Sequence, residues 1–229
     1  MNYENYEFAP VTLREHTLKT FLWMFVGLLV TTAVSFVSIQ TGLLLHLLIK
    51  IPYLAFVFLI AQIAVVLLFN RQLKKLNPTM TLLFYIIYSV IMGISISSIA
   101  YVYDLRSIFM AFLICVVYFG LLVFIGYTTK FNLMKLGPIL FVGLLALVIV
   151  EIAMLIFKMP IDTMIISAIS LVLFTGITAY DTQKMKLLYA ENVDNQQALK
   201  TLAIYSAFQL YLDFINLFLD ILRLISKRR

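Results

Sequence analysis

Seven long apolar stretches divide this 229-residue sequence and constrain its fold more than any other feature. Each is close to the ~20 residues that a helix needs to cross the hydrocarbon core of a bilayer. The chain is 63% hydrophobic and only 12% charged, which is typical of a polytopic membrane protein and not of a soluble domain. The stretches cover Leu18–Ile39, Pro52–Phe69, Thr79–Tyr103, Ser107–Thr128, Leu136–Phe157, Thr163–Thr182 (with an extension to Tyr189 as an alternative) and Leu199–Leu224.

The gaps between these stretches are too short to hold a soluble domain. We therefore expect an all-α membrane protein in which residues 18–225 form a seven-transmembrane-helix bundle. Residues 1–17 would be a polar cytoplasmic tail and residues 226–229 a basic C-terminal tail. Because no small-residue cleavage site accompanies the first stretch, we interpret it as an uncleaved span and not as a signal peptide.

Lysine and arginine are distributed unevenly between the two sides of the expected bundle. The gaps on the side of the N-terminus carry more of them, which predicts a cytoplasmic N-terminus by the positive-inside rule. Seven spans then place the C-terminus outside. That end is itself basic, with Arg223, Lys227, Arg228 and Arg229, which favours an alternative with one half-inserted stretch and a C-terminus inside.

The last stretch carries an acidic residue, Asp213, near its middle. A charged side chain at bilayer depth costs at least ~2.5–3.5 kcal/mol on insertion scales, so it usually faces protein or a watery cavity. On a helix, Asp213 shares one polar face with Asn216, Asp220 and Arg223. We therefore expect the last helix to be central in the bundle. The structural alternative is that Asp213 only hydrogen-bonds a neighbouring helix and that Asp220 only pairs with Arg223.

Two further charged residues are expected near the cytoplasmic ends of their helices. Asp181 lies near the inner end of the sixth stretch, and Arg71 lies at the inner end of the second. Two close carboxylates in a low dielectric resist double ionisation and titrate as a coupled unit. An arginine can hold one carboxylate in its charged form, and ionised carboxylate oxygens suit Ca²⁺. These residue types therefore favour a pH-responsive latch.

The sequence leaves open whether Asp181 and Asp213 touch. If the midpoints of their two stretches lie level, Asp181 is ~10–15 Å nearer the cytoplasm at a rise of ~1.5 Å per residue. The smaller offset applies if the sixth stretch continues to Tyr189. Helix tilt or a different insertion depth would have to remove the offset for direct pairing.

The segments Ala179–Gln183 and Leu210–Phe218 together resemble the Bax inhibitor-1 family, also called the transmembrane Bax-inhibitor-motif family. Gly93–Ser97 and Gly126–Lys130 extend the resemblance over most of the chain. It implies a seven-helix bundle around a central last helix and a pH-sensitive calcium leak. It also implies that the metal-binding and gating aspartate pair falls on Asp181 and Asp213, and the latching arginine on Arg71.

Two acids depart from the pattern expected of bacterial relatives. Asp220 would either make the outer end of an ion path more attractive to cations or only pair with Arg223. Glu151 would either line the outer pore, with Asn216 and Asp220, or extend to the interface near Lys158. The short tail and the Ile-, Lys- and Asn-rich composition favour a bacterial plasma-membrane protein.

We predict a pH-sensitive calcium leak channel with calcium ions and protons as its ligands, no catalytic residues and no cofactor. A proton-coupled cation exchanger and a regulatory membrane scaffold without transport remain alternatives. Tyr180-Asp181 fits one half of the pattern of an intramembrane aspartyl protease. The other half is missing, because this sequence has neither glycines before Asp213 nor a Pro-Ala-Leu segment after it. With His16, His46 and Cys115 as the only residues of their types, a histidine-rich metal site and an intrachain disulfide are not expected. The sequence shows no basic face interleaved with aromatic residues, so nucleic-acid binding is not expected.

Overall fold

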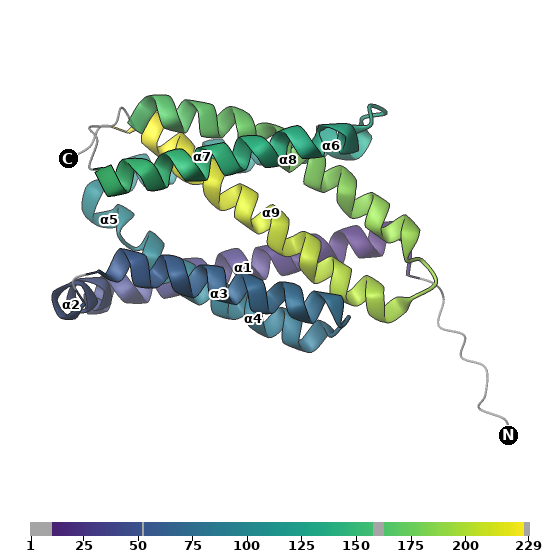
Figure 1. The fold of residues 1–229 in the computed structure, drawn as a ribbon, viewed down its shortest axis with the longest axis horizontal. Helices are drawn as coiled ribbons and strands as arrows, with labels where there is room; N and C mark the ends of the chain where they lie inside the picture. Colours follow the sequence, from purple (N-terminus) through teal and green to yellow (C-terminus); the bar gives the residue numbers. More distant parts are fainter. Residues whose placement is uncertain (1–10, 52, 158–162, 227–229) are drawn as a thin grey trace, which may run out of the picture.

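The computed structural model describes residues 11–51, 53–157 and 163–226, and the ordered elements in these ranges are helices (Figure 1). Seven helical segments of the described chain are long and apolar enough to cross a membrane, as predicted. The elements are α1 (Leu13–Thr41), α2 (Leu43–Lys50), α3 (Leu54–Lys74), α4 (Pro78–Ile96), α5 (Ile99–Val102), α6 (Leu105–Thr128), η1 (Leu133–Leu136), α7 (Gly137–Phe157), α8 (Thr163–Glu191) and α9 (Gln196–Ile225).

Polar residues in the gaps start the long helices. Thr12 begins α1 with a capping box, in which its side chain accepts from the Glu15 N–H and the Glu15 carboxylate accepts from the Thr12 N–H. Asn77, Asp104 and Asn195 cap α4, α6 and α9 by accepting a hydrogen bond from the backbone N–H three residues on. These caps satisfy backbone donors that would otherwise be unpaired at the helix ends.

The structure differs from the expected segments in several places. Helix α1 begins at Leu13, within residues 1–17 that were expected to form a polar tail. A short helix, α2, connects the first two spans. The third stretch breaks between α4 and α5, where the Ser97 and Ser98 hydroxyls donate to backbone carbonyls three residues earlier. The sixth stretch continues past Thr182 to Glu191, so the longer alternative is correct.

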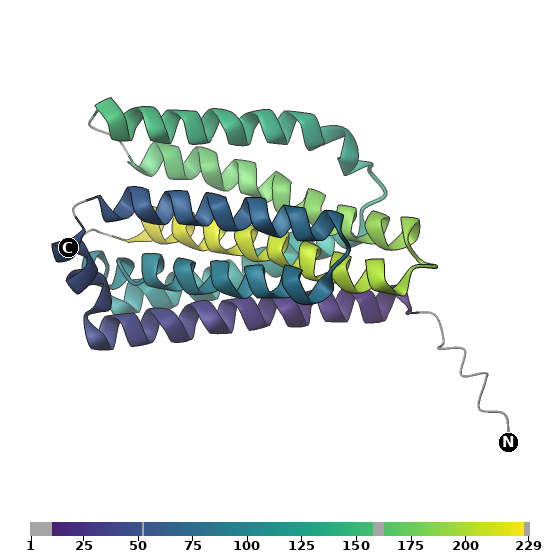
Figure 2. The same cartoon turned by 60° about the horizontal axis from the view of Figure 1, so that its bottom comes forward.

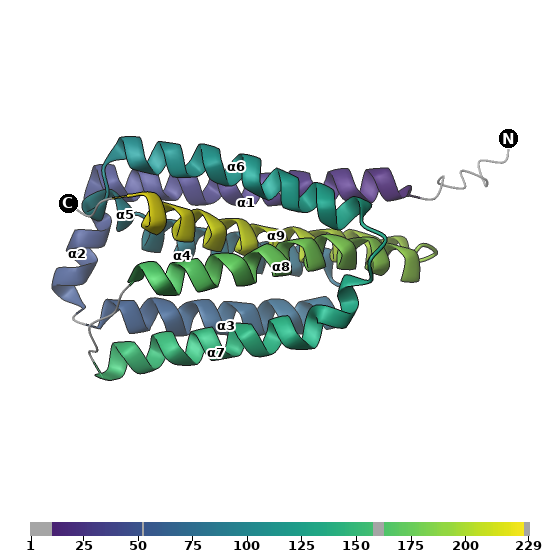
Figure 3. The same cartoon turned by 90° about the horizontal axis from the view of Figure 1, so that it is seen from above.

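Consecutive spans run in opposite directions, so α1, α4, α7 and α9 begin at the same end of the bundle (Figures 1 and 3). The helix pair α8 and α9 has the most extensive packing, and α1 packs against both α4 and α9. Helix α7 packs mainly on α8 and η1, at the edge of the bundle (Figure 2). Its outer face exposes large apolar side chains such as Ile139, Phe141 and Ile149, which suits contact with lipid.

Helix α9 is the most buried of the spans. Within its most apolar window 72% of the residues are buried, compared with 33% or less in the other spans of the described chain. Aromatic rings from α3, α4 and α9 pack against one another around Phe208, including Phe69, Tyr85 and Tyr88. A helix that is buried on most sides can carry polar residues at membrane depth without exposing them to lipid.

Candidate functional site

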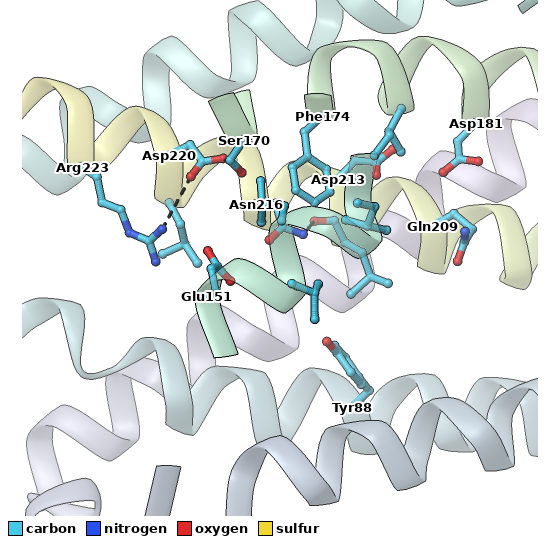
Figure 4. Close-up of a pocket in the computed structure, with 16 residues that line it drawn as sticks. Tyr88, Glu151, Ser170, Phe174, Asp181, Gln209, Asp213, Asn216, Asp220 and Arg223 are labelled. Carbon is cyan, nitrogen blue, oxygen red and sulfur yellow. Dashed lines mark hydrogen bonds and ion pairs between the residues drawn. The ribbon is translucent and has the colours of Figure 1, made fainter. Parts of the chain in front are cut away.

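An acidic cavity of about 340 Å³ lies between α4, α7, α8 and α9 (Figure 4). Each of the last three helices contributes a stripe of residues at helical spacing, and α4 contributes Tyr88. The polar and charged lining residues are Tyr88, Glu151, Ser170, Asp181, Gln209, Asp213, Asn216, Asp220 and Arg223. Leucine, isoleucine, valine and phenylalanine side chains fill the spaces between them.

The polar stripe of α9 runs along the cavity from Gln209 to Arg223. Figure 4 shows Asp181 and Gln209 toward one end, Asp213 and Asn216 between, and Asp220 with Arg223 toward the other. The Asn216 amide donates to the Leu212 carbonyl at 2.8 Å, which holds this side chain against its own helix. The cavity is therefore a narrow acidic space that extends along the helices instead of across them.

Asp213 lies at the middle of this stripe with an unsatisfied oxygen. Its residue is 3% exposed, and its Oδ2 atom has no hydrogen-bond partner among the described residues. The neighbouring groups that act on its carboxyl come from α8: the carboxyl of Asp181 and the hydroxyl of Thr178. The proton of that hydroxyl is donated to the Phe174 carbonyl at 2.7 Å. A buried carboxyl oxygen with no donor among the described residues is costly unless a proton or another partner satisfies it.

Asp181 approaches Asp213 from α8. It is 6% exposed, lines the same cavity and interacts electrostatically with Asp213. The two acids therefore line one cavity, and whether their carboxyls touch stays open. The cation that acts on Asp181 is Lys184, one turn along α8, whose Nζ donates to the Tyr205 hydroxyl at 3.1 Å. Lys184 also lies over the rings of Tyr180 and Tyr205.

Arg71 lies apart from this pair. It is exposed in the last turn of α3, and no salt bridge joins it to Asp181, although the structure describes both residues. The latch expected between them is therefore not formed in this arrangement. The basic residue that acts on Asp181 is instead Lys184, because a residue three positions on lies on the same face of the helix.

The other end of the cavity holds a second charged group. Asp220 is buried, accepts a hydrogen bond from the Ser170 hydroxyl and forms a salt bridge with Arg223 at 3.6 Å. Asp220 thus both lines the cavity and pairs with Arg223, while its attraction for cations stays a prediction. Glu151 from α7 lines the same end and interacts electrostatically with Asp220. Lys158, proposed as a neighbour of Glu151, lies outside the described residues.

Several lining residues escaped the sequence interpretation. Ser170 precedes Asp181 by three helical turns on the same face of α8, and Gln209 precedes Asp213 by one turn on α9, so periodicity could have found both. Tyr88 carried no such signal, and neither did Lys184, which acts on Asp181 without lining the cavity. Tyr88 reaches the cavity only because α4 packs against α9.

The described residues hold no group of three or more histidine, cysteine or acidic side chains arranged to retain a metal ion. Asp181 and Asp213, the two acids predicted as metal ligands, both line the cavity, and their role as ligands stays a prediction.

Seven membrane-spanning helices define an integral membrane protein, and an acidic cavity between them is consistent with a membrane channel or transporter. The chain belongs to the Bax inhibitor-1 family, since residues 13–229 match the family model described as "Inhibitor of apoptosis-promoting Bax1".

Bacterial membrane proteins are among its relatives. The inner membrane protein YbhL of Escherichia coli is 34% identical over 95% of this chain and 93% of its own length. The protein RP147 of Rickettsia prowazekii is 32% identical over 95% of this chain and 91% of its own length. A membrane protein of Streptococcus pyogenes serotype M1 is 30% identical over 80% of this chain and 79% of its own length.

Proposed function

We propose that this protein is a pH-sensitive calcium leak channel whose ion path runs through the acidic cavity. The observation that carries the proposal is the unpartnered Oδ2 atom of Asp213, buried beside Asp181 at the middle of the cavity. In a bilayer, an ionisable residue without a protein partner is costly and marks a pathway for ions or protons. The proposal includes no catalytic step and no cofactor.

Protons and Ca²⁺ would compete for the same two carboxyls. Ionised oxygens attract Ca²⁺, whereas protonated carboxyls bind it poorly. Because the two acids interact, each proton or cation that binds changes the charge that the other acid experiences. Flux through the cavity should therefore depend on pH over the range in which this pair titrates.

Arg71 would close the path by holding ionised Asp181. The arrangement with Arg71 exposed would then be the released state, and the latched state would need α3 to approach α8. Acid would favour release, because protonation removes the charge that the guanidinium attracts. Stronger acid would then weaken Ca²⁺ binding, so flux should rise and afterwards fall as pH decreases.

The test is Ca²⁺ entry into liposomes that contain the purified protein, measured with a trapped fluorescent indicator. Wild-type protein should admit Ca²⁺ faster than empty liposomes, with a rate that depends on pH. Asp213→Asn should reduce the rate about tenfold and flatten its pH response, whereas Asp194→Asn, at an exposed acid between α8 and α9, should behave as wild type.

Two outcomes would replace the proposal with one of its alternatives. Saturable Ca²⁺ movement that runs against its gradient when a proton gradient is imposed would indicate an exchanger built on the same carboxyls. Liposomes with correctly inserted wild-type protein that admit Ca²⁺ no faster than empty ones would indicate a scaffold without transport.

A further inference from the structure

A second cavity, of about 540 Å³, lies at the end of the bundle where α1, α4 and α9 begin. It shares no lining residue with the acidic cavity. Three helices form its walls, and each contributes residues from its N-terminal half: Lys19 to Val26 from α1, Pro78 to Leu82 from α4 and Lys200 to Ile204 from α9. Under the predicted topology this end of the bundle lies in the cytoplasmic leaflet of the membrane.

The lining of this cavity combines an apolar wall with two lysines. Leu22, Val26, Leu82, Ala203 and Ile204 supply aliphatic surface, and Trp23 supplies an indole ring. Lys19 and Lys200 are exposed on different helices, and no described carboxylate forms a salt bridge with either. Two unpaired ammonium groups beside apolar surface are complementary to a molecule with an anionic head and a hydrocarbon tail.

The charges around the lysines also favour an anion. The acid nearest in sequence to Lys19 is Glu15, and its carboxylate is occupied by the capping hydrogen bond to the Thr12 N–H at 3.1 Å. Tryptophan and lysine are both typical of the level at which lipid headgroups meet acyl chains.

We propose that this cavity binds an acidic phospholipid, with the headgroup phosphate between Lys19 and Lys200 and an acyl chain along the apolar wall beside Trp23. The inference stands independently of the calcium leak, because it uses different residues and a different cavity. A free phosphate ion would satisfy the lysines but leave the apolar wall unfilled, which is why a lipid fits the site better.

Trp23 is the single tryptophan of the chain, so its fluorescence reports on this cavity alone. Protein is placed in phosphatidylcholine bilayers that contain increasing fractions of a lipid with brominated acyl chains, which quench tryptophan on contact. Brominated phosphatidylglycerol should quench Trp23 at roughly tenfold lower mole fraction than brominated phosphatidylcholine, since each lysine near an anionic headgroup contributes to the preference. Quenching should also saturate, as expected of a site.

The variant Lys19→Gln/Lys200→Gln should lose the preference for phosphatidylglycerol. The matched control is Lys130→Gln/Lys135→Gln, which removes the same charge at exposed positions between α6 and α7 and should keep the preference. Val26→Phe, which fills part of the apolar wall, should reduce quenching by both lipids.

Equal quenching by both brominated lipids in the wild-type protein would overturn the proposal, because Trp23 would then only contact bulk lipid. A preference lost equally in both lysine variants would overturn it as well, since the attraction would belong to the whole surface. Loss of the preference on addition of inorganic phosphate at constant ionic strength would show an ion site in place of a lipid site.

Discussion

Asp181 on α8 and Asp213 on α9 line one cavity and interact electrostatically, although 32 positions separate them in the sequence. The two helices pack against each other more extensively than any other pair in the described structure. This packing places both acids between helices long enough to cross a membrane, and Asp213 Oδ2 has no hydrogen-bond donor among the residues that the structure describes. The relationship can be tested by changing each acid alone and both together.

The first prediction concerns the coupling of the two acids. Asp181→Asn and Asp213→Asn should each alter the pH profile of Ca²⁺ flux, and the double variant should change it by less than the sum of the two single effects. The physical reason is that removing either charge already removes the interaction between them. The measurement is Ca²⁺ flux in liposomes from acidic to alkaline pH. Strictly additive effects would show that the two carboxyls function independently.

The second prediction concerns Arg71. If it holds Asp181 in a closed state, Arg71→Ala should make the protein leakier at neutral pH, and the difference should disappear in acid. A change of only ~1.4 kcal/mol in the balance of closed and open states would alter their ratio tenfold. The control is Arg14→Ala, which removes a different exposed arginine, on α1 instead of α3. Identical pH profiles for wild-type and Arg71→Ala protein would rule out the latch hypothesis. Lys184 would then be the only described cation known to act on Asp181.

The third prediction concerns the packing of α6 against α8. A Cβ atom at Gly126 would lie 2.5 Å from the Ala179 carbonyl oxygen and 2.9 Å from its Cα, so the backbone itself would have to move. Gly126→Ala should therefore lower stability by about 1–3 kcal/mol, measured as a lower Tm in detergent. Gly120→Ala, on the same helix, meets no atom within 4 Å and should leave the Tm unchanged or raise it. A Tm for Gly126→Ala equal to that of Gly120→Ala would contradict this packing.

The fourth prediction concerns orientation. The lysine and arginine distribution predicts a cytoplasmic N-terminus, and seven spans then place the C-terminus outside. Reporters fused at each end in separate chains should therefore report opposite locations. A cytoplasmic signal from a reporter after Arg229 would mean that one of the seven segments does not cross the membrane.

Much of the architecture could be read from the sequence because it depends on local properties. Runs of apolar residues set the number of spans, and capping residues such as Thr12 and Asn195 set where helices begin. The polar face of α9 followed from helical periodicity alone. The break at Ser97 and the short helix α2 did not, because brief polar or apolar interruptions are compatible with several backbone paths.

The sequence by itself determined which residues share a helix face, because a fixed 3.6-residue repeat makes that a local property. Tertiary structure decided how far each helix is shifted along its neighbour, and therefore that Asp181 shares a cavity with Asp213 while Arg71 lies apart. It also brought Tyr88 and Glu151 to that cavity from α4 and α7. In a bilayer such shifts are set by close van der Waals packing at small residues such as Gly126. The hydrophobic effect cannot specify them, because the lipid acyl chains around the bundle are as apolar as the helix surfaces.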